Sequence, residues 1–314
     1  MDKPIVGIFR EKRDNYFEFK APHYRQAYIE IGLKLEQKGI YPAILVGQST
    51  YLGQGKFSKH WHPVKDGDNF DFEERGEITV DMVWNKDHFI DDGKVLTVNT
   101  RELNEICWSK NKTYEVLSEF HPKTLNVQSA QELRDAIDSV PSEMVAVKEI
   151  EGSSGDGVFV GLKRDAYNTN LKFPLIVQEF IETSAGVPGI TDKRHDVRVV
   201  LANGQPIAAT LRTPPEGGFK SNLGYGGENR LLNISDLPDD LLQICSNIDK
   251  VLQRYGKFRL YSVDFGLTPN GWRMFEANGM PGVIAVSRGE QAIEYQDKLT
   301  DFLKMIGERV KGKK

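Results

Sequence analysis

The chain has 314 residues, 39% hydrophobic and 27% charged, with a formal net charge of −4. This length favours two or three small lobes, and the charge lacks the positive clustering typical of proteins that bind nucleic acid or anionic membranes. Cys107 and Cys245 have neither disulfide-framework nor zinc-site spacing. Because no apolar run resembles a signal region or a membrane span, we expect a cytoplasmic protein.

The first hundred residues predict an open α/β lobe. A short buried strand at Pro4–Phe9 precedes a helix at Pro22–Lys38, where apolar residues recur at helical spacing. A second strand at Tyr41–Gly47 completes a parallel βαβ unit. The stretch Gln48–Asp71 is polar and shows no clear period; with the loop Lys12–Pro22 it is expected to contribute to substrate choice, and no residue in it receives a role. A further core strand is expected at Asp81–Trp84.

The remaining chain predicts two further lobes, so that the expected lobes are residues 1–98, 99–181 and 182–314. Ser129 with Glu132 three residues later forms a capping box, which starts the second of the predicted helices. The predicted helices are Ser109–Phe120, Gln128–Ser139, Pro238–Tyr255 and Glu290–Val310. The predicted strands are Met144–Ile150, Val158–Gly161, Leu175–Ile181, Asp196–Ala202, Pro206–Arg212 and a hairpin at Tyr261–Ala277.

A glycine-rich loop at Gly152–Gly157 is flanked by strands on both sides. A dinucleotide fold or a P-loop needs a helix after the loop, and a P-loop also needs Gly-Lys-Ser/Thr, so both are excluded. A loop of glycines and serines between two strands can instead act as a flap whose N–H groups cover phosphates, with Lys148 beside it. A solvent-exposed hairpin turn with a surface lysine is the alternative for this segment.

The hairpin Tyr261–Asn278 carries two acids that we expect to lie side by side. If its turn is a three-residue loop, Thr268 faces Trp272, and Asp264 then lies opposite Glu276 on one face. Asn278 points the same way. Two carboxylates and an amide oxygen are ligands suited to Mg²⁺. A register shifted by one residue would instead place the acids on the solvent face.

A long loop rich in glycine follows Arg212 and suggests a functional segment. Arginine suits two-pronged contact with a carboxylate or a phosphate. We therefore interpret Arg212 as functional, and we interpret Arg194 as a surface ion pair.

These motifs, in this order, resemble those of the ATP-grasp enzymes, most of all bacterial glutathione synthetase and the glutamate ligases that modify ribosomal protein. The resemblance covers about Asn99 to Gly282, roughly two thirds of the chain. The matching segments are Asn99, Lys112, Lys148 with GSSGDGV, Gln178–Glu182, Asp196–Arg198, Arg212 with PPEGGFKSNLGYGGE, Asp264, Glu276–Asn278 and Pro281–Gly282. The family often has an acid before its first lysine, where this chain has Asn111, and the glutamate-ligase type has arginine at Lys220.

The resemblance implies an ATP-grasp fold and a role for each motif. It gives Arg212 and Asn222 to the transferred phosphate and the tetrahedral centre, and Asp264, Glu276 and Asn278 to two Mg²⁺ ions, which Mn²⁺ could replace. The implied ATP-binding residues are Lys112, Lys148, Gly152, Ser153, Ser154, Gly155, Gly157, Glu179, Phe180, Ile181, Glu182, Asp196 and Lys220.

The implied reaction is ADP-forming carbon–nitrogen ligation. ATP converts a carboxylate into an acyl phosphate, and an amine then displaces the phosphate. The implied partners are small molecules, an amino acid or a peptide among them, and the family suggests a homodimer or homotetramer. The alternatives are an ATP-grasp kinase, for which the four basic residues of Arg10–Lys20 could form a substrate pocket, and a nucleotide-binding protein without catalysis.

Overall fold

The computed structural model describes residues 3–11, 22–67, 69–151 and 156–312. These residues form two compact units. Unit 1 comprises Met1–Arg101, Gly256–Leu260 and Met280–Lys314, and unit 2 comprises Glu102–Tyr255 and Tyr261–Gly279. The lobe boundaries expected after residues 98 and 181 stay a prediction. Within the described residues, no helix is both long enough and apolar enough to cross a bilayer.

Unit 1 is built on a six-stranded sheet with the strand order β6-β5-β2-β1-β8-β9. The parallel strands are β1 (Ile5–Arg10), β2 (Tyr41–Val46), β8 (Met82–Asn85) and β9 (Leu96–Val98). The antiparallel extension consists of β5 (His60–Asp66) and β6 (Asn69–Arg75). The predicted parallel pairing of the first two strands is confirmed, because β1 and β2 pair in register from Ile5 to Arg10.

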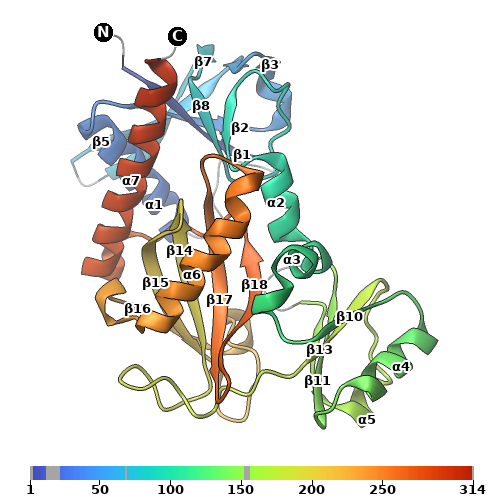
Figure 1. Cartoon of the computed structure of the whole chain (residues 1–314). Coiled ribbons are helices and arrows are strands. Elements are labelled where there is room, and N and C mark those ends of the chain that lie inside the picture. Colours follow the sequence, from blue (N-terminus) through green and yellow to red (C-terminus); the bar gives the residue numbers. More distant parts are fainter. Residues whose placement is uncertain (1–2, 12–21, 68, 152–155, 313–314) are drawn as a thin grey trace. The chain divides into compact units, whose positions relative to one another are not determined.

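Two helices of unit 1, α1 (Pro22–Gln37) and α7 (Glu290–Lys311), pack on this sheet and on each other, as Figure 1 shows. Ala27, Ile31 and Leu35 of α1 are fully buried, which is the helical spacing expected from the sequence. The stretch Gln48–Asp71, in which no residue received a predicted role, contains β5, the start of β6 and part of a small sheet. That sheet consists of β3 (Tyr51–Gly53), β4 (Lys56–Phe57) and β7 (Ile78–Thr79).

Unit 2 contains a four-stranded antiparallel sheet in the order β10-β13-β11-β12. Its strands are β10 (Thr124–Val127), β13 (Leu175–Glu179), β11 (Met144–Glu149) and β12 (Val158–Leu162), with helices α4 (Ala130–Ser139) and α5 (Lys163–Ala166) beside them (Figure 1). The predicted capping box is confirmed, since the Ser129 hydroxyl accepts from the backbone N–H of Glu132 at 3.3 Å.

The second sheet of unit 2 has five strands in the order β16-β15-β14-β17-β18. They are β16 (Glu228–Leu232), β15 (Gln205–Thr213), β14 (Asp196–Ala202), β17 (Leu260–Thr268) and β18 (Gly271–Asn278). The helices α2 (Arg101–Trp108), α3 (Lys110–Leu117) and α6 (Asp239–Leu252) contribute Leu103, Leu117, Leu241 and Ile248 to the core beside this sheet. The sequence analysis did not predict β9, β10, β16, α2 or α5, each of which spans eight residues or fewer, too short for a period to be read reliably.

Candidate functional site

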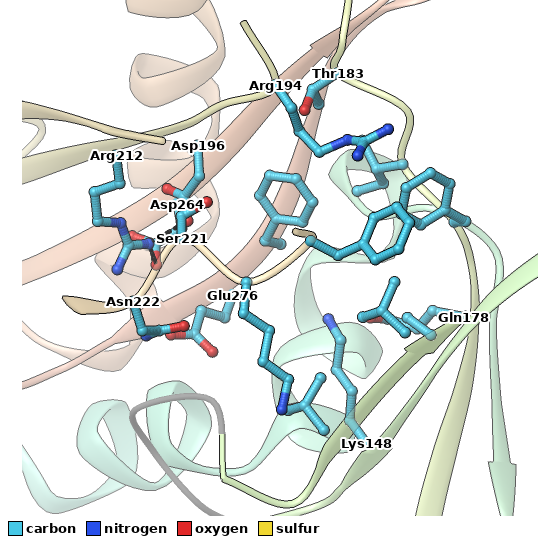
Figure 2. A pocket seen from close by; sticks show the side chains of 18 of the residues that line it. Lys148, Gln178, Thr183, Arg194, Asp196, Arg212, Ser221, Asn222, Asp264 and Glu276 are labelled. Atoms are coloured by element: carbon cyan, nitrogen blue, oxygen red, sulfur yellow. Dashed lines mark hydrogen bonds and ion pairs between the residues drawn. The ribbon is translucent and has the colours of Figure 1, made fainter. Parts of the chain in front are cut away.

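Unit 2 contains a cavity lined from both of its sheets. Its apolar lining is Ala146, Val158, Val160, Phe180, Ile181, Phe219 and Phe275. Its polar lining is Lys110, Lys148, Asp156, Gln178, Glu179, Thr183, Arg194, His195, Asp196, Arg212, Lys220, Ser221, Asn222, Asp264 and Glu276. Figure 2 shows Lys148, Glu276, Asn222 and the Asp264 cluster directed toward one shared space. An apolar wall beside a densely charged one suits a ligand with a flat apolar end and an anionic end.

Ten of the residues predicted for the site line this cavity. They are Lys148, Glu179, Phe180, Ile181, Asp196, Arg212, Lys220, Asn222, Asp264 and Glu276. Lys112, Gly157, Glu182 and Asn278 are not among the lining residues. The predicted flap residues Gly152, Ser153, Ser154 and Gly155 lie outside the described residues.

The opposition of Asp264 and Glu276 across β17 and β18 is confirmed, but the turn that was expected to produce it is wrong. Thr268 pairs with Gly271 rather than Trp272, so the loop has two residues. A bulge then shifts the register between Asp264 and Phe265, which returns the two acids to opposite positions. Two deviations of one residue each therefore cancel, and the acids share a face.

Asp264 is the centre of a buried ion-pair cluster. Arg198 Nε and Nη2 each donate to one of its carboxylate oxygens at 2.7 Å, and Arg212 Nη2 donates to both Asp264 and Asp196. Burial would raise the pKa of Asp264, but the charges of Arg198 and Arg212 outweigh it and lower that pKa. Asp264 is therefore held ionised. Arg198 contacts both of the opposed acids, because its Nη2 is also 3.7 Å from Glu276.

Two buried atoms of this cluster have no hydrogen-bond partner among the described residues, Asp196 Oδ1 and Arg212 Nε. Burial, the largest influence, and the nearby Asp264 charge together raise the pKa of Asp196, although Arg212 opposes them. Native proteins satisfy nearly all such buried groups. An acceptor and a donor without partners beside a cavity are therefore expected to meet a ligand there.

Lys112, the predicted ATP-binding lysine near the start of α3, does not line the cavity. Lys112 pairs with Glu105 at 3.1 Å, and about half of its side chain is exposed. Lys110 lines the cavity instead, because its backbone N–H donates to Ile150 O at 3.1 Å and anchors the start of α3 beside the end of β11. Side chains two residues apart on a helix do not share a face, so only one of the two lysines can reach the cavity.

Burial lowers the pKa values of the two cavity lysines. Burial lowers the pKa of Lys148 to about 8, and the Lys110 charge adds to this effect while Glu276 opposes it. Burial likewise lowers the pKa of Lys110, opposed first by Glu276. Two partly buried ammonium groups that line the same cavity are suited to bind an anionic ligand.

His121, which follows the turn η2 (Ser118–Phe120), is buried near this site and should make the protein sensitive to acid. Neither ring nitrogen has a hydrogen-bond partner in the described part of the chain. Burial and, next, the Lys148 charge lower its pKa from 6.5 to about 3. Between these values the unfolded chain binds a proton that the folded chain does not, so the free energy of unfolding falls as pH falls.

We predict that His121→Phe removes this acid sensitivity. The wild type should lose about 2 kcal/mol more unfolding free energy than the variant between pH 8 and pH 5. Urea unfolding of both proteins at the two pH values measures the difference. An equal loss in the two proteins would show that the histidine is not held neutral by the fold.

More than half of the chain matches the model of one known family. Residues 110–303 match the RimK-like ATP-grasp domain, and the chain therefore belongs to the RimK-like ATP-grasp family. The family and the fold expected from the sequence are thus confirmed. ATP-grasp ligases generally use ATP and Mg²⁺.

Curated relatives carry the name of one ligase. The chain is 30% identical over 171 residues to a probable alpha-L-glutamate ligase of Nitrosococcus oceani, covering 52% of each chain. It is 28% identical over 173 residues to the protein of that name in Vibrio vulnificus, covering 53% of this chain and 52% of the relative. The chain thus spans about half the length of the curated relatives it matches.

Solved structures resemble this one over nearly its full length. D-alanyl-alanine synthetase A from Vibrio cholerae has a TM-score of 0.63 and 14% identity, with 99% of each chain covered. The macrocyclase MdnC of Microcystis aeruginosa, bound to its precursor peptide, has a TM-score of 0.62 and 12% identity, with 95% of this chain and 99% of MdnC covered. At these identities the likeness establishes the shared fold.

The donor chemistry beside the cavity fits a magnesium ion. Asp264 and Glu276 offer opposed carboxylates, and Asp196 Oδ1 is a buried acceptor without a partner among the described residues. No three His, Cys, Asp or Glu side chains cluster as a metal site within the part of the chain that is described. An ion held here would therefore complete its shell with oxygens from an amide, water or phosphate, as Mg²⁺ commonly does.

Proposed function

We propose that this protein is an ATP-dependent carboxylate–amine ligase that forms an amide or peptide bond and releases ADP and phosphate. One observation carries the proposal: Lys110, Lys148, Arg212 and the opposed Asp264 and Glu276 line one cavity of an ATP-grasp fold. Family membership and the glutamate-ligase names of the relatives support it.

In this proposal the cavity divides its work along the ATP molecule. Glu179, Phe180 and Ile181, which we call the hinge, receive the adenine ring. Glu182, the next residue along the chain, binds the ribose. Lys110 and Lys148 bind the phosphates, since both line the cavity and an ammonium group forms charge-assisted hydrogen bonds with phosphate oxygens. Asp264, Glu276 and Asn278 would hold Mg²⁺, which when bound neutralises charge on the phosphates.

The transferred group meets Arg212 and Asn222. A carboxylate oxygen of the substrate attacks the γ-phosphorus and ADP leaves, which gives an acyl phosphate. The amine then attacks the acyl carbon, phosphate leaves, and the amine loses a proton. Arg212 Nε, a buried donor without a partner in the described residues, is suited to the oxygen on which charge develops. Lys220 and Asp196 complete the cationic and anionic sides of the same space.

Release of ADP and phosphate against a panel of acids and amines tests this function. We would supply ATP and Mg²⁺ with amino acids, dipeptides and short carboxylic acids, singly and in pairs. Phosphate release that needs both an acid and an amine supports the ligase. Formation of a stable phosphorylated alcohol without an amine would replace it with the kinase alternative, whose expected basic loop lies mostly outside the described residues.

The two lysines at the start of α3 provide a matched test of the nucleotide site. Lys110→Met should weaken binding of a fluorescent ATP analogue about 10- to 100-fold, because a buried charge-assisted contact to phosphate is lost. Lys112→Met should leave it unchanged, since Lys112 pairs with Glu105 away from the cavity lining. The reverse order of effects would return the phosphate contact to Lys112.

A further inference from the structure

Arg194 joins two segments that are distant in sequence at one end of the cavity. Its Nη2 lies 3.0 Å from both carboxylate oxygens of Glu182, just after the hinge, and its Nη1 donates to Gly218 O at 3.3 Å. The guanidinium also lies 4.6 Å from the ring centroid of Phe219 and 5.8 Å from that of Phe180. The interpretation of Arg194 as an ordinary surface ion pair is therefore incomplete, because its side chain lines the cavity.

The second segment is the 214–227 loop, which connects β15 to β16. Phe219 of this loop packs edge-on against Phe180 of the hinge, with ring centroids 5.6 Å apart. The next three residues, Lys220, Ser221 and Asn222, also line the cavity. Fixing Phe219 therefore also sets where the following polar side chains stand.

Farther along the chain, the same loop contacts Asp156, which lies just before β12. The Tyr225 hydroxyl donates to Asp156 at 2.9 Å, and the Lys220 ammonium lies 4.2 Å from the Tyr225 ring centroid. The end of the 214–227 loop near Tyr225 is therefore held by contacts between polar groups at the surface, which are individually weak. The attachment at Arg194 combines an ion pair, in which Nη2 contacts both Glu182 oxygens, with a backbone hydrogen bond and aromatic contacts, and is the firmer of the two.

One atom of Arg194 indicates that the attachment also faces a ligand. Its Nε is buried and has no hydrogen-bond partner among the described residues, a state that proteins rarely tolerate away from a binding site. Figure 2 shows the side chain beside Thr183, extending toward the group of rings and apart from the Asp264 and Arg212 cluster. The unpartnered donor therefore belongs to the aromatic end of the cavity.

We propose that Arg194 is a positioning residue that fastens the 214–227 loop to the hinge, so that nucleotide affinity and the placement of Asn222 depend on one side chain. This inference rests on the proposed function, because it takes the hinge to be the place of the base and ribose. A nucleotide that occupies the hinge settles against Phe180 and Glu182, the groups that Arg194 holds. Bound nucleotide and the ordered loop thus stabilise each other through Arg194.

The test compares Arg194→Met, Arg194→Lys and, as a control, Arg230→Met. Arg230 is an exposed arginine of the same unit that donates to the Ile190 carbonyl at 3.0 Å. Hydrogen exchange of the 214–227 loop without nucleotide should rise in Arg194→Met, stay unchanged in Arg230→Met, and recover in part in Arg194→Lys, which keeps the charge but not the fork. Affinity for a fluorescent ADP analogue with Mg²⁺ should fall about 10-fold in Arg194→Met.

The two readouts separate failure of this inference from failure of the proposed function. If the wild type does not bind the ADP analogue, the proposed function fails, while faster exchange in Arg194→Met alone still supports the fastening. If the wild type binds and Arg194→Met matches it in exchange and affinity, Arg194 holds nothing and the inference is overturned. Equal melting temperatures of wild type and Arg194→Met exclude a general loss of fold as the cause.

Discussion

Replacing Glu276 by glutamine should lower ADP formation about 10²- to 10³-fold, the effect typical of removing one preorganised electrostatic group. Glutamine keeps the shape of the side chain and removes its charge. The Glu276 charge is the strongest attraction acting on both Lys110 and Lys148. Glu276 also lies opposite Asp264 on the neighbouring strand. Its loss takes one carboxylate from the expected Mg²⁺ site and leaves two cations without a shared partner.

Asp135→Asn is the matched control for this experiment. Asp135 is an exposed acid on α4 of the same unit, hydrogen-bonded to Gln131 on its own helix, so the same change of charge there should leave turnover within twofold. Both variants should remain folded, since 39% of the Glu276 side chain is exposed. Full activity in Glu276→Gln would remove the carboxylate pair from the mechanism.

Most of the site could be predicted because its residues stand at the ends of strands with clear patterns. Asp264 and Glu276 were placed opposite each other from the turn signal Pro269-Asn270-Gly271 alone. The turn is one residue shorter than expected, and the bulge that compensates for it has no signal in the sequence. A bulge depends on how the strand packs, so sequence reasoning reached the correct pair by a path that was wrong in its details.

The choice between Lys110 and Lys112 could not be made from the family pattern alone. Both lysines lie within three residues at the start of α3. The family often has an acid before its first lysine, and this chain has Asn111 before Lys112. The deciding contact joins Lys110 N to Ile150 O, 40 residues along the chain, which a local pattern does not contain. The one local signal was Ser109, the N-cap residue of α3, which places Lys110 at the first position of the helix.

Arg194 shows a second limit of sequence reasoning. An arginine in a polar loop is usually a surface ion pair, and this one does pair with Glu182. Its further contacts with Phe180 and Phe219 arise because the hinge and the 214–227 loop meet in space. The strands after Gln48 were not predicted for another reason: β5 and β6 are rich in histidine and charged residues, and their few apolar residues do not form a sustained alternation.

Arg212→Met should be the most destabilising of the substitutions considered, lowering the unfolding free energy by about 3–5 kcal/mol at pH 7. Arg212 donates to two buried acids, Asp196 and Asp264, and its own pKa is raised by their charges in spite of burial. Methionine fills much of the space but leaves Asp196 with no cation that hydrogen-bonds to it. The cost is the buried, uncompensated charge rather than the lost contact alone.

A second substitution separates this electrostatic cost from a packing defect. Removing Arg212 should raise the pKa of Asp196 further, so the stability deficit of the variant relative to wild type at the same pH should shrink as pH falls and that acid takes up a proton. Arg212→Met with Asp196→Asn should likewise recover about half of the loss at pH 7, because the amide carries no charge to bury. Urea unfolding at pH 7 and pH 5 measures both effects, with Arg230→Met as the exposed control. If neither the lower pH nor Asp196→Asn restores stability, Arg212 stabilises the fold by packing and not by compensating the charge of Asp196.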